Sequence, residues 1–506
     1  GDGDGGSNEH QNYPVLAAQA GDPHLQISLN SAANASYAID LFANPDCSQQ
    51  NATRYLGTVD LVTNATGDGH VAWNLIGSGA IPGDYLTATA TDAAGNTSEL
   101  SDCAQVDFAN VLTVTLSSDY GDLEPGDGLC DVTVDSPGSQ CTLRAALEEL
   151  RAQPAVTWRD RVEFAVEATG TVVIDPLTPL PAIDRPVFID GTTQPGAYCP
   201  EGNFPASLPI TLDGANLTNA KGLELLPSSS GSRVQGLTIV NFGTGLFVAS
   251  ADNEIYCNQI GVDQNGNSGE QGVGIILNGS DNLVGDVPSS RRNLISGNGA
   301  GIEAVANGNQ IVGNFVGTTA NGQGAQGNTT GIQVEGDAGI AITRNVISGN
   351  HEFGLIFIGV SQAVVEANRI GVAADGVTPL GNELGGLVLA EAAQNEIGGP
   401  LGAQNIIAFN GGPGITFALP NRAGGSDEGN DLRYNRLFGN DGLGIDFYAD
   451  GVTPNDPDDG DDGPNGLQNY PVLNTAAAPG TVQIALNSLP NQTFSLTFYA
   501  SANCDP

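Results

Sequence analysis

The chain of 506 residues contains 70 glycines, 40% apolar residues and only 14% charged residues. Extended disorder is excluded because apolar residues are spread along the whole chain, and collagen is excluded because the glycines lack a three-residue period. A net charge of −42 repels nucleic acid and anionic membranes, and the chain has no run of about 18 apolar residues that could cross a bilayer.

The chain repeats its own beginning. The segment QNYPVL at residues 11–16 recurs at residues 468–473, and the offset of 457 residues holds without a gap through Cys47 and Cys504. Short alternating segments with turn signals between them continue the first copy, and this pattern predicts a β-sandwich over residues 1–109. The second copy, residues 468–506, has room for only about three strands, so we expect an incomplete sandwich there.

The clearest helical pattern lies between the first sandwich and the centre of the chain, within residues 110–159. Leu143, Ala146, Leu147 and Leu150 recur on one helical face, and Thr142 is a good N-cap residue. An open-ended stack of strands must be protected against the addition of further strands. We therefore predict a short α-helix that caps the N-terminal end of such a stack.

The chain has seven cysteines and no C-x-x-C pair, so zinc and redox chemistry are disfavoured. We predict disulfides formed in an oxidising compartment, with 47–103 and 130–141 as the favoured pairs, and therefore a secreted or cell-surface protein. The alternative is that the cysteines are buried free thiols. The cysteines predicted to form disulfides are Cys47, Cys103, Cys130, Cys141, Cys199 and Cys257.

Residues 160–450 are dominated by a recurring asparagine pattern. The pattern N-x-[ILV]-x-x-N begins at Asn253, Asn293, Asn309, Asn345, Asn405 and Asn435. A second motif, [IV]-G-[VT] followed by a Gly-rich excursion, begins at Ile260, Val316 and Ile370. Stacked coils explain both motifs, because apolar residues pack on their counterparts one coil away, while asparagine tolerates left-handed bends and its amides form ladders. We predict a right-handed parallel β-helix with loops of varied length; a β-propeller or jelly roll does not predict this recurrence.

An acidic linker at residues 451–467 is the best candidate metal site. Its sub-pattern D-G-D-x-G-x-N also occurs near the N-terminus at the same offset of 457 residues. Oxygen ligands at alternate positions with an interposed glycine suit Ca²⁺, although the spacing is not that of an EF-hand. The alternative is a solvated, flexible acidic linker. The candidate ligands are Asp2, Asp4, Asn8, Asp456, Asp458, Asp459, Asp461, Asp462 and Asn465.

The segment DGLC at residues 127–130, followed by CTLRAA at 141–146, resembles the CSLREA-type region that precedes right-handed β-helix repeats in large bacterial surface proteins. The segment DGTTQPG at 190–196 is similar to a segment of the same proteins, and residues 87–98 resemble a signature of bacterial Ig-like surface modules. Ala145 replaces the family's Glu, which would complete a capping box, so the helix start should be less well fixed. The resemblance implies exported, often adhesin-like proteins with Ig-like sandwiches.

These observations predict a structural repeat unit of an extracellular fibre, stalk or adhesin, stabilised by Ca²⁺ and assembled head to tail. Its expected partners are copies of itself or adjacent repeats of the same chain, joined by strand complementation at the incomplete C-terminal sandwich. Because residue 1 is Gly rather than Met, we expect a processed protein or an internal segment.

Catalysis on polysaccharide is the alternative function. Enzymes that cleave polysaccharides need clustered carboxylates, usually beside a basic group, and this chain has one Lys and four His. Asp213, Asp263 and Asp446 lie far apart in the sequence, and no pattern brings them together. We therefore expect that the chain is not an enzyme; a β-helix polysaccharide-degrading enzyme or a carbohydrate-binding surface protein, with surface polysaccharide as partner, is the alternative.

Overall fold

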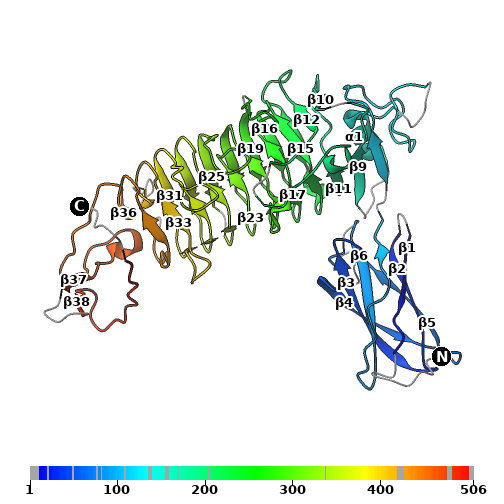
Figure 1. The fold of residues 1–506 in the computed structure, drawn as a ribbon, viewed down its shortest axis with the longest axis horizontal. Helices are drawn as coiled ribbons and strands as arrows, with labels where there is room; N and C mark the ends of the chain where they lie inside the picture. Colours follow the sequence, from blue (N-terminus) through cyan, green and yellow to red (C-terminus); the bar gives the residue numbers. More distant parts are fainter. Residues whose placement is uncertain are drawn as a thin grey trace.

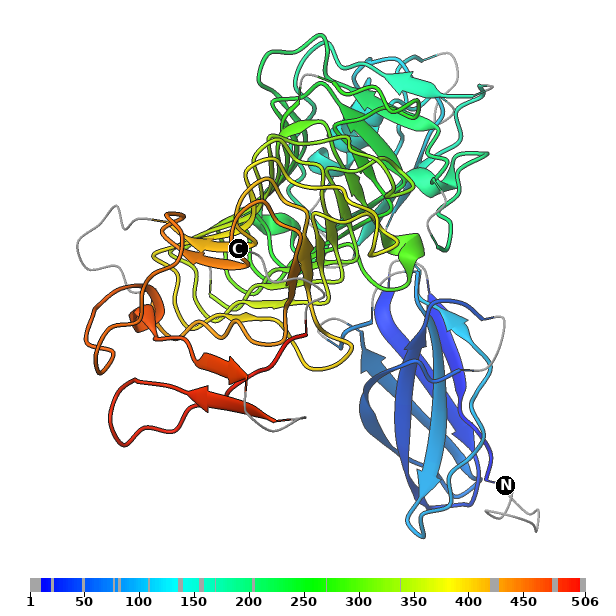
Figure 2. The ribbon, with the colours of Figure 1, turned by 60° about the vertical axis from the view of Figure 1, so that its left-hand side comes forward.

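The structure, a computed structural model, describes residues 11–500 except for 20–21, 48–50, 76–77, 81–82, 108–109, 135–139, 154–158, 169, 203–204, 270, 337, 419–426 and 476–480. Its body is a rod of stacked coils, with a two-sheet unit beside the first coils and a short hairpin beside the last (Figure 1). Figure 2 shows the same coils stacked one behind another in a view turned by 60°.

The N-terminal unit is an antiparallel β-sandwich. One sheet has the order β1-β2-β5 and the other the order β4-β3-β6-β7. Alternate residues of β2 and β3, such as Ile27 and Ile39, are buried and pack between the sheets. A disulfide joins Cys47 to Cys103. The strands are β1 (Val15–Gln19), β2 (Asp22–Asn30), β3 (Ser36–Asn44), β4 (Arg54–Val62), β5 (Asp68–Asn74), β6 (Tyr85–Asp92) and β7 (Ala104–Gln105).

The cap helix α1 spans Leu143–Ala152, and its apolar face packs on the core of the rod. Thr142 caps it, since its hydroxyl accepts a hydrogen bond from the backbone N–H of Ala145. Two further contacts surround the helix start, where the capping box is incomplete. Arg144 binds both carboxylate oxygens of Asp119 at 2.9 and 3.0 Å, and the disulfide Cys130–Cys141 closes the preceding loop. No helix among the described residues is long and apolar enough to span a membrane.

The rod consists of three parallel sheets, and each full coil contributes one strand to each sheet in turn. The first sheet begins with β8, which precedes the cap helix in the chain. Its strands are β8 (Val111–Val114), β9 (Asp160–Phe164), β11 (Val187–Asp190), β14 (Arg233–Gln235), β17 (Glu254–Tyr256), β20 (Leu283–Val284), β23 (Gln310–Val312), β26 (Ala341–Thr343), β29 (Val364–Glu366) and β32 (Glu396–Ile397).

The second and third sheets follow the same rule. The second sheet contains β10 (Val172–Ile174), β12 (Ile210–Asp213), β15 (Leu237–Val240), β18 (Gln259–Ile260), β21 (Leu294–Ile295), β24 (Phe315–Val316), β27 (Val346–Ile347), β30 (Arg369–Ile370), β33 (Ile406–Ala408) and β35 (Arg436–Phe438). The third contains β13 (Lys221–Leu225), β16 (Thr244–Val248), β19 (Gln271–Leu277), β22 (Asn298–Ala304), β25 (Thr330–Glu335), β28 (Phe353–Ile358), β31 (Gly385–Ala390), β34 (Ile415–Phe417) and β36 (Ile445–Phe447). Short 3-10 turns are η2 (Gly191–Thr193), η3 (Pro227–Ser229) and η4 (Ser289–Arg291), and η5 (Pro464–Leu467) is a kinked turn with left-handed residues at Asn465 and Gly466.

The core of the rod is built from columns of aliphatic side chains. In the second sheet, inward residues of successive coils pair in register. Each lies about 4.8 Å from its counterpart in the next coil, so the side chains contact one another and are fully buried. This column comprises Ile239, Ile260, Ile295, Val316, Ile347, Ile370 and Ile407.

Asparagine side chains form ladders at all three corners of the rod. In each rung, the backbone N–H and the side-chain amide of one asparagine usually both donate to the side-chain oxygen of the asparagine in the next coil, as Asn314 does to Asn345. The ladder between the first and second sheets comprises Asn258, Asn293, Asn314, Asn345, Asn368, Asn405 and Asn435. The ladder between the second and third sheets comprises Asn298, Asn328, Asn350, Asn382, Asn410 and Asn440.

The third corner has two shorter ladders, Asn253–Asn282–Asn309 and Asn395–Asn430–Asn465, separated by the buried apolar residues Ile340 and Ala363. The pattern N-x-[ILV]-x-x-N therefore spans one short strand and links two different ladders, which explains its irregular spacing. At the corner between the first and second sheets, the residue before the asparagine is left-handed in most coils, for example Arg344 with φ 60°, whereas the ladder asparagines are not. The expectation that the asparagines themselves take this conformation is therefore wrong at that corner.

The C-terminal hairpin repeats the register of the first hairpin. Val15 pairs with Ser28 in β1–β2, and Val472 pairs with Ala485 in β37 (Val472–Thr475) and β38 (Val482–Ala485), at the same offset of 457 residues. Polar contacts repeat as well, since Gln11 donates to the hydroxyl of Ser31 and Gln468 to that of Ser488.

The ladder makes a specific prediction about stability. Replacing Asn345 by Ala removes, in a buried corner, the oxygen that accepts from the backbone N–H and the side-chain amide of Asn314, and it removes one donor to the carbonyl of Ile311. We expect a loss of about 2–4 kcal/mol in unfolding free energy, measured by urea denaturation. Asn321→Ala, in an exposed loop where the side chain bonds only its neighbours, should cost less than about 1 kcal/mol; equal losses would contradict a special role for the ladder.

Candidate functional site

The outer face of the second sheet changes character along the rod. Its first strands present Thr211, Thr238 and Gln259, whereas the later strands present Leu294 and Phe315. The later apolar residues form a cluster with Val262, Val346 and Ala374, with Ala320 packed against it. Excursions at residues 263–269, 318–327 and 373–381, each closed by a similar antiparallel bridge, follow the second motif, and the second and third of them supply Ala320 and Ala374 to this cluster.

A polar pocket of about 370 Å³ lies over the first strands of the second sheet, beside the end of this apolar cluster. Strands β10, β12 and β15 contribute one part of its lining, and the first excursion contributes the other. Most lining residues carry an amide, a hydroxyl or a carboxylate, and none of them is Lys, Arg or His. The lining residues are Thr171, Val173, Thr211, Asp213, Val240, Asn241, Asp263, Gln264, Asn265, Asn267, Ser268 and Gly269.

Asp263 holds the excursion in shape. Its Oδ1 accepts hydrogen bonds from the backbone N–H groups of Asn265 and Asn267 at 2.9 and 2.7 Å, and its Oδ2 accepts from the amide of Asn267 at 2.8 Å. Burial works to raise the pKa of Asp263, but the hydrogen bonds from Asn267 and Asn265 outweigh burial and keep the pKa below its usual value. The carboxylate is therefore ionised, and its turn occupies both of its oxygens.

Asp213 is held on one side only. Its Oδ1 accepts from the amide of Asn241 at 2.7 Å and from the backbone N–H of Ala215 at 3.0 Å, while Oδ2 has no hydrogen bond to any described residue. Thr211 stands on the same outward side of β12 and is 5% exposed, and its buried hydroxyl has no partner. A buried hydroxyl without a partner costs about 1–3 kcal/mol, so a polar group placed beside Thr211 would gain a hydrogen bond.

Sequence reasoning missed this pocket. It treated Asp213 and Asp263 as remote, whereas the structure places them in one pocket and places Asp446 on β36, near the other end of the rod. Both residues lie at or just after the end of a strand of the second sheet, which is the signal that could have related them. Coils of unequal length hide that relation in the sequence.

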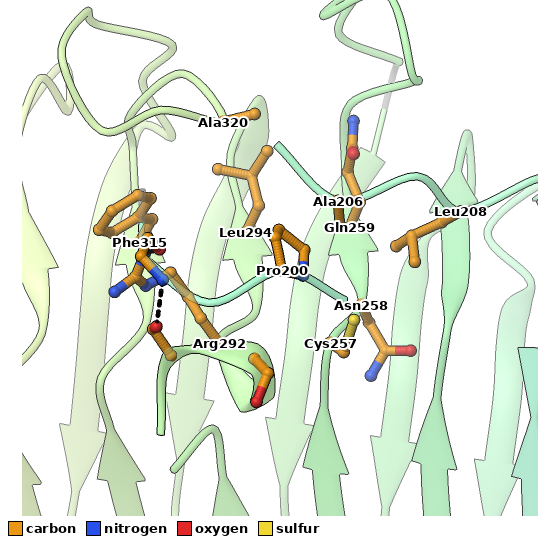
Figure 3. A pocket seen from close by; sticks show the side chains of 13 residues that line it. Pro200, Ala206, Leu208, Cys257, Asn258, Gln259, Arg292, Leu294, Phe315 and Ala320 are labelled. Atoms are coloured by element: carbon orange, nitrogen blue, oxygen red, sulfur yellow. Dashed lines mark hydrogen bonds between the residues drawn. The ribbon is translucent and has the colours of Figure 1, made fainter. Parts of the chain in front are cut away.

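The second pocket on this face is too small for a sugar. It measures about 40 Å³ and lies between Pro200, Leu208, Leu294 and Phe315. The guanidinium of Arg292 stacks 3.9 Å from the centre of the Phe315 ring and closes one side (Figure 3). The disulfide Cys199–Cys257 ties the covering loop to the first coils, so this cavity is a packing gap with room for water at most.

Two paired arginines lie on a different surface, the outer face of the first sheet. Arg161 pairs with Asp190 at 2.7 Å, and Arg233 pairs with Glu254. Burial works against the charge of Arg233, but the carboxylate of Glu254 outweighs it and raises the pKa of Arg233. These charges are neutralised by one another, and none of them lies in the polar pocket.

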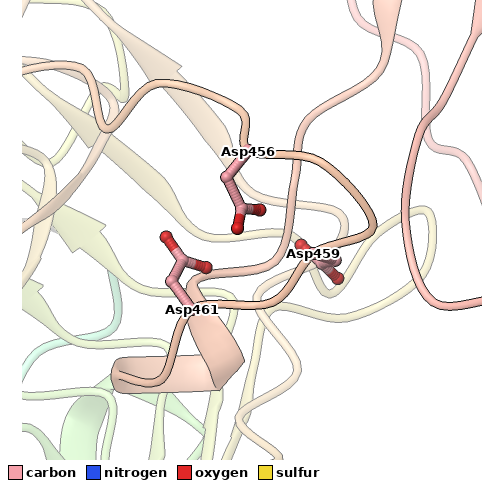
Figure 4. Close-up of side chains that lie close together, drawn as sticks. All are labelled: Asp456, Asp459 and Asp461. Atoms are coloured by element: carbon pink, nitrogen blue, oxygen red, sulfur yellow. The ribbon is translucent and has the colours of Figure 1, made fainter.

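The acidic linker brings together three of its predicted ligands. Carboxylate oxygens of Asp456, Asp459 and Asp461 all lie within 4.8 Å of one another (Figure 4). Asp459 is anchored, since its oxygens accept from the backbone N–H of Asn469 and the hydroxyl of Ser488, both at 2.7 Å. Oδ1 of Asp461 is buried without a partner.

The other predicted ligands lie elsewhere. Asp458 and Asp462 are exposed and do not join this group. Asn465 forms a rung of an asparagine ladder, where its side-chain oxygen accepts from Asn430. Asp2, Asp4 and Asn8 lie outside the described residues.

Comparison with known proteins identifies the fold. A family model described as a right-handed beta helix region matches residues 317–454, and the prediction of an all-β fold with a right-handed parallel β-helix is confirmed. No curated protein matches the chain.

Two kinds of solved structure are similar to the chain. The catalytic domain of a GH87 alpha-1,3-glucanase in complex with nigerose has 10% identity and a TM-score of 0.26, covering 86% of this chain and 90% of that one. The A-module of the mannuronan C-5 epimerase AlgE6 of Azotobacter vinelandii has 13% identity and a TM-score of 0.23, covering 62% of this chain and 95% of that one.

One sequence-based prediction is corrected by this comparison. We expected that the chain is not an enzyme, yet the solved structures with which it compares include a glucanase catalytic domain and an epimerase module. That expectation is overturned. The CSLREA-type and Ig-like parts of the resemblance have no counterpart in the comparison.

Proposed function

We propose that the protein binds an extracellular polysaccharide in the polar pocket of its β-helix. The single observation that carries this proposal is the pocket of about 370 Å³ lined by amide, hydroxyl and carboxylate side chains. Small-molecule sites usually measure about 300–1,000 Å³ and fix their ligand with a few placed polar groups. A sugar ring, which presents hydroxyls around an apolar frame, matches a lining of this kind.

The scaffold supports the same proposal. Strands β10, β12 and β15 form rungs of a rigid sheet, and Gln264 ties the excursion to it by donating to the hydroxyl of Thr238 at 2.7 Å. Pre-organised groups of this kind reduce the entropy lost on binding. Three disulfides fit an exported protein in an oxidising compartment, where polysaccharides are found.

A reaction on the bound sugar would draw on Asp213 among the pocket carboxylates. Its Oδ2 is unpartnered, whereas both oxygens of Asp263 are occupied by the turn. General acid–base chemistry needs a carboxyl group within hydrogen-bonding reach of the substrate. Assays of binding should therefore be accompanied by assays for new reducing ends and for epimerised or unsaturated sugars.

Binding is tested by retention of the chain on a panel of insoluble or immobilised polysaccharides. We expect retention on at least one polysaccharide, and at least a roughly tenfold weaker affinity for Thr171→Trp, because the indole would fill the pocket beside β10. Ala94→Trp, on an exposed turn of the sandwich, is the matched control and should bind as the unchanged chain does. Lack of retention on every polysaccharide of the panel would overturn the proposal.

Self-association through the C-terminal hairpin is the second candidate function, and one observation favours it. Val482 and Ile484 are 60% and 42% exposed, whereas their counterparts Leu25 and Ile27 in the sandwich are 0% and 1% exposed. A second sheet from another copy, or from an adjacent repeat, would bury this face as the sandwich does, giving a head-to-tail stalk or fibre.

Sedimentation velocity over a range of concentrations tests this association. We expect concentration-dependent assembly that Ile484→Asp abolishes, because a buried unpaired charge would oppose sheet packing. Val452→Asp, at another exposed apolar residue, should leave assembly unchanged. A chain that remains monomeric at all concentrations would contradict this candidate function.

We also propose that Asp456, Asp459 and Asp461 bind Ca²⁺ and stiffen the linker. A ligand that binds only the folded chain raises its melting temperature by mass action. We expect millimolar Ca²⁺ to raise the melting temperature of the unchanged chain relative to a chelator, and to have no such effect on the double variant Asp456→Asn, Asp461→Asn. Identical melting with Ca²⁺ and with the chelator would remove this site.

A further inference from the structure

We propose that the polar pocket selects a sugar unit that carries no negative charge, and that Asp213 and Thr211 of β12 make this selection. The inference rests on the proposed carbohydrate-binding function and names its ligand class. Neutral sugars and amino sugars belong to that class, whereas uronates and sulfated sugars do not.

The charges of the lining residues disfavour an anionic sugar. Its twelve lining residues include two carboxylates and no basic side chain. The hydrogen bonds of its turn keep Asp263 ionised, and Oδ2 of Asp213 has no cation beside it among the described residues. An anionic sugar would bring a like charge into this pocket with no arginine or lysine to neutralise it, and like charges at short range repel.

The rest of the chain strengthens the same preference. Its net charge is −42, so anionic polymers are repelled at long range. Arg161 and Arg233 lie on the first sheet and are already paired with carboxylates, and Arg369 and Arg436 lie on later strands of the second sheet and do not line the pocket. A polyuronate therefore has no complementary surface at the pocket.

The geometry of β12 places groups that suit a neutral sugar side by side. Thr211 and Asp213 are two residues apart on one strand, so their side chains leave the same face of the sheet. Val173 of β10 pairs with Thr211 in register and is 45% exposed. This arrangement places an acceptor, a hydroxyl and an apolar patch side by side, which matches the hydroxyls and the C–H face of a sugar ring.

A comparison between neighbouring threonines marks Thr211 as the recognition residue. Thr238 occupies the equivalent position on β15, pairs with Thr211 in register, and receives a hydrogen bond from Gln264. Thr211 has no such partner, although it is as deeply set in the sheet. Rotation about its χ1 bond is the movement that would turn the hydroxyl toward a ligand.

The test uses the full chain and three hexasaccharides of matched length: a neutral gluco-oligosaccharide, a chitosan oligomer and an oligogalacturonate. Binding is measured by calorimetry at low salt and at about 0.5 M salt, where long-range charge effects are screened. We expect the neutral or amino sugar to bind at least about tenfold more tightly than the oligogalacturonate, and a preference to persist at high salt because it arises within the pocket.

Two variants test whether Thr211 and Asp213 produce the preference for a sugar without negative charge. Thr211→Val and Asp213→Asn should each weaken binding of the preferred sugar at least about fivefold, and Asp213→Asn should also narrow the preference over oligogalacturonate. Glu335→Gln removes one charge from an exposed position on the third sheet and should change neither quantity. Thr211→Val should melt no lower than the unchanged chain, because it removes a buried hydroxyl that has no partner; a lower melting temperature would show that the hydroxyl is satisfied and would count against the inference.

The outcomes separate the inference from the function on which it rests. If no hexasaccharide and no polysaccharide binds, the proposed function fails. If a sugar binds but oligogalacturonate binds as tightly, or if neither variant weakens binding, the inference fails and carbohydrate binding stands.

Discussion

The rod depends on satisfying backbone and side-chain polar groups at corners that are buried. Each coil leaves its sheet hydrogen bonds three times per turn, and a buried N–H without an acceptor is costly. The asparagine ladders meet this constraint with one residue type: the oxygen of Asn345 accepts from the Asn314 backbone and amide, while its own amide donates to Ile311 and Asn368. The apolar columns hold the coils together, but the ladders decide where each coil bends.

This arrangement fixes the length of the strands between corners but leaves the length of the loops beyond the corners free to vary. A strand between two corners must keep its length, because the asparagines at its ends and the aliphatic side chains within it must all face their counterparts in the next coil. Beyond a corner the chain can leave the rod for a loop of any length, as it does at residues 263–269 and 318–327. The polar pocket lies at this boundary, where the first excursion adjoins strands that no later excursion covers. Its groups are therefore held by a rigid sheet on one side and by the turn of Asp263 on the other.

The chain also uses its few basic residues sparingly. Arginines on the first sheet are bound to carboxylates, Arg144 holds the cap to Asp119, and Arg292 covers an apolar cluster. The polar side chains of the pocket carry carboxylates, amides and hydroxyls, and none of its lining residues is basic. The separation of the basic network from the pocket, more than any single contact, supports a ligand without negative charge.

Local patterns in the sequence determined the strands, the cap helix and two of the disulfides. The recurring asparagines and aliphatic residues contact their counterparts one coil away, so they recur as a pattern in the sequence. The apolar face of α1 appears in the sequence as residues at helical spacing. The repeat of 457 residues likewise predicted that the last hairpin would resemble the first. The contact between Arg144 and Asp119 near the start of α1 joins residues far apart in the sequence, and no local rule reveals it.

Only the tertiary structure decided which polar residues meet. Asp213 and Asp263 are separated by coils of unequal length, so no spacing in the sequence shows that they share a pocket. Asn465 follows the pattern of a metal ligand in the sequence, yet its amide is a rung of a ladder. The physical reason is the same in both cases: the columns and ladders that define a coil are periodic and short-ranged, whereas a site on its surface depends on how far each loop departs and where it returns.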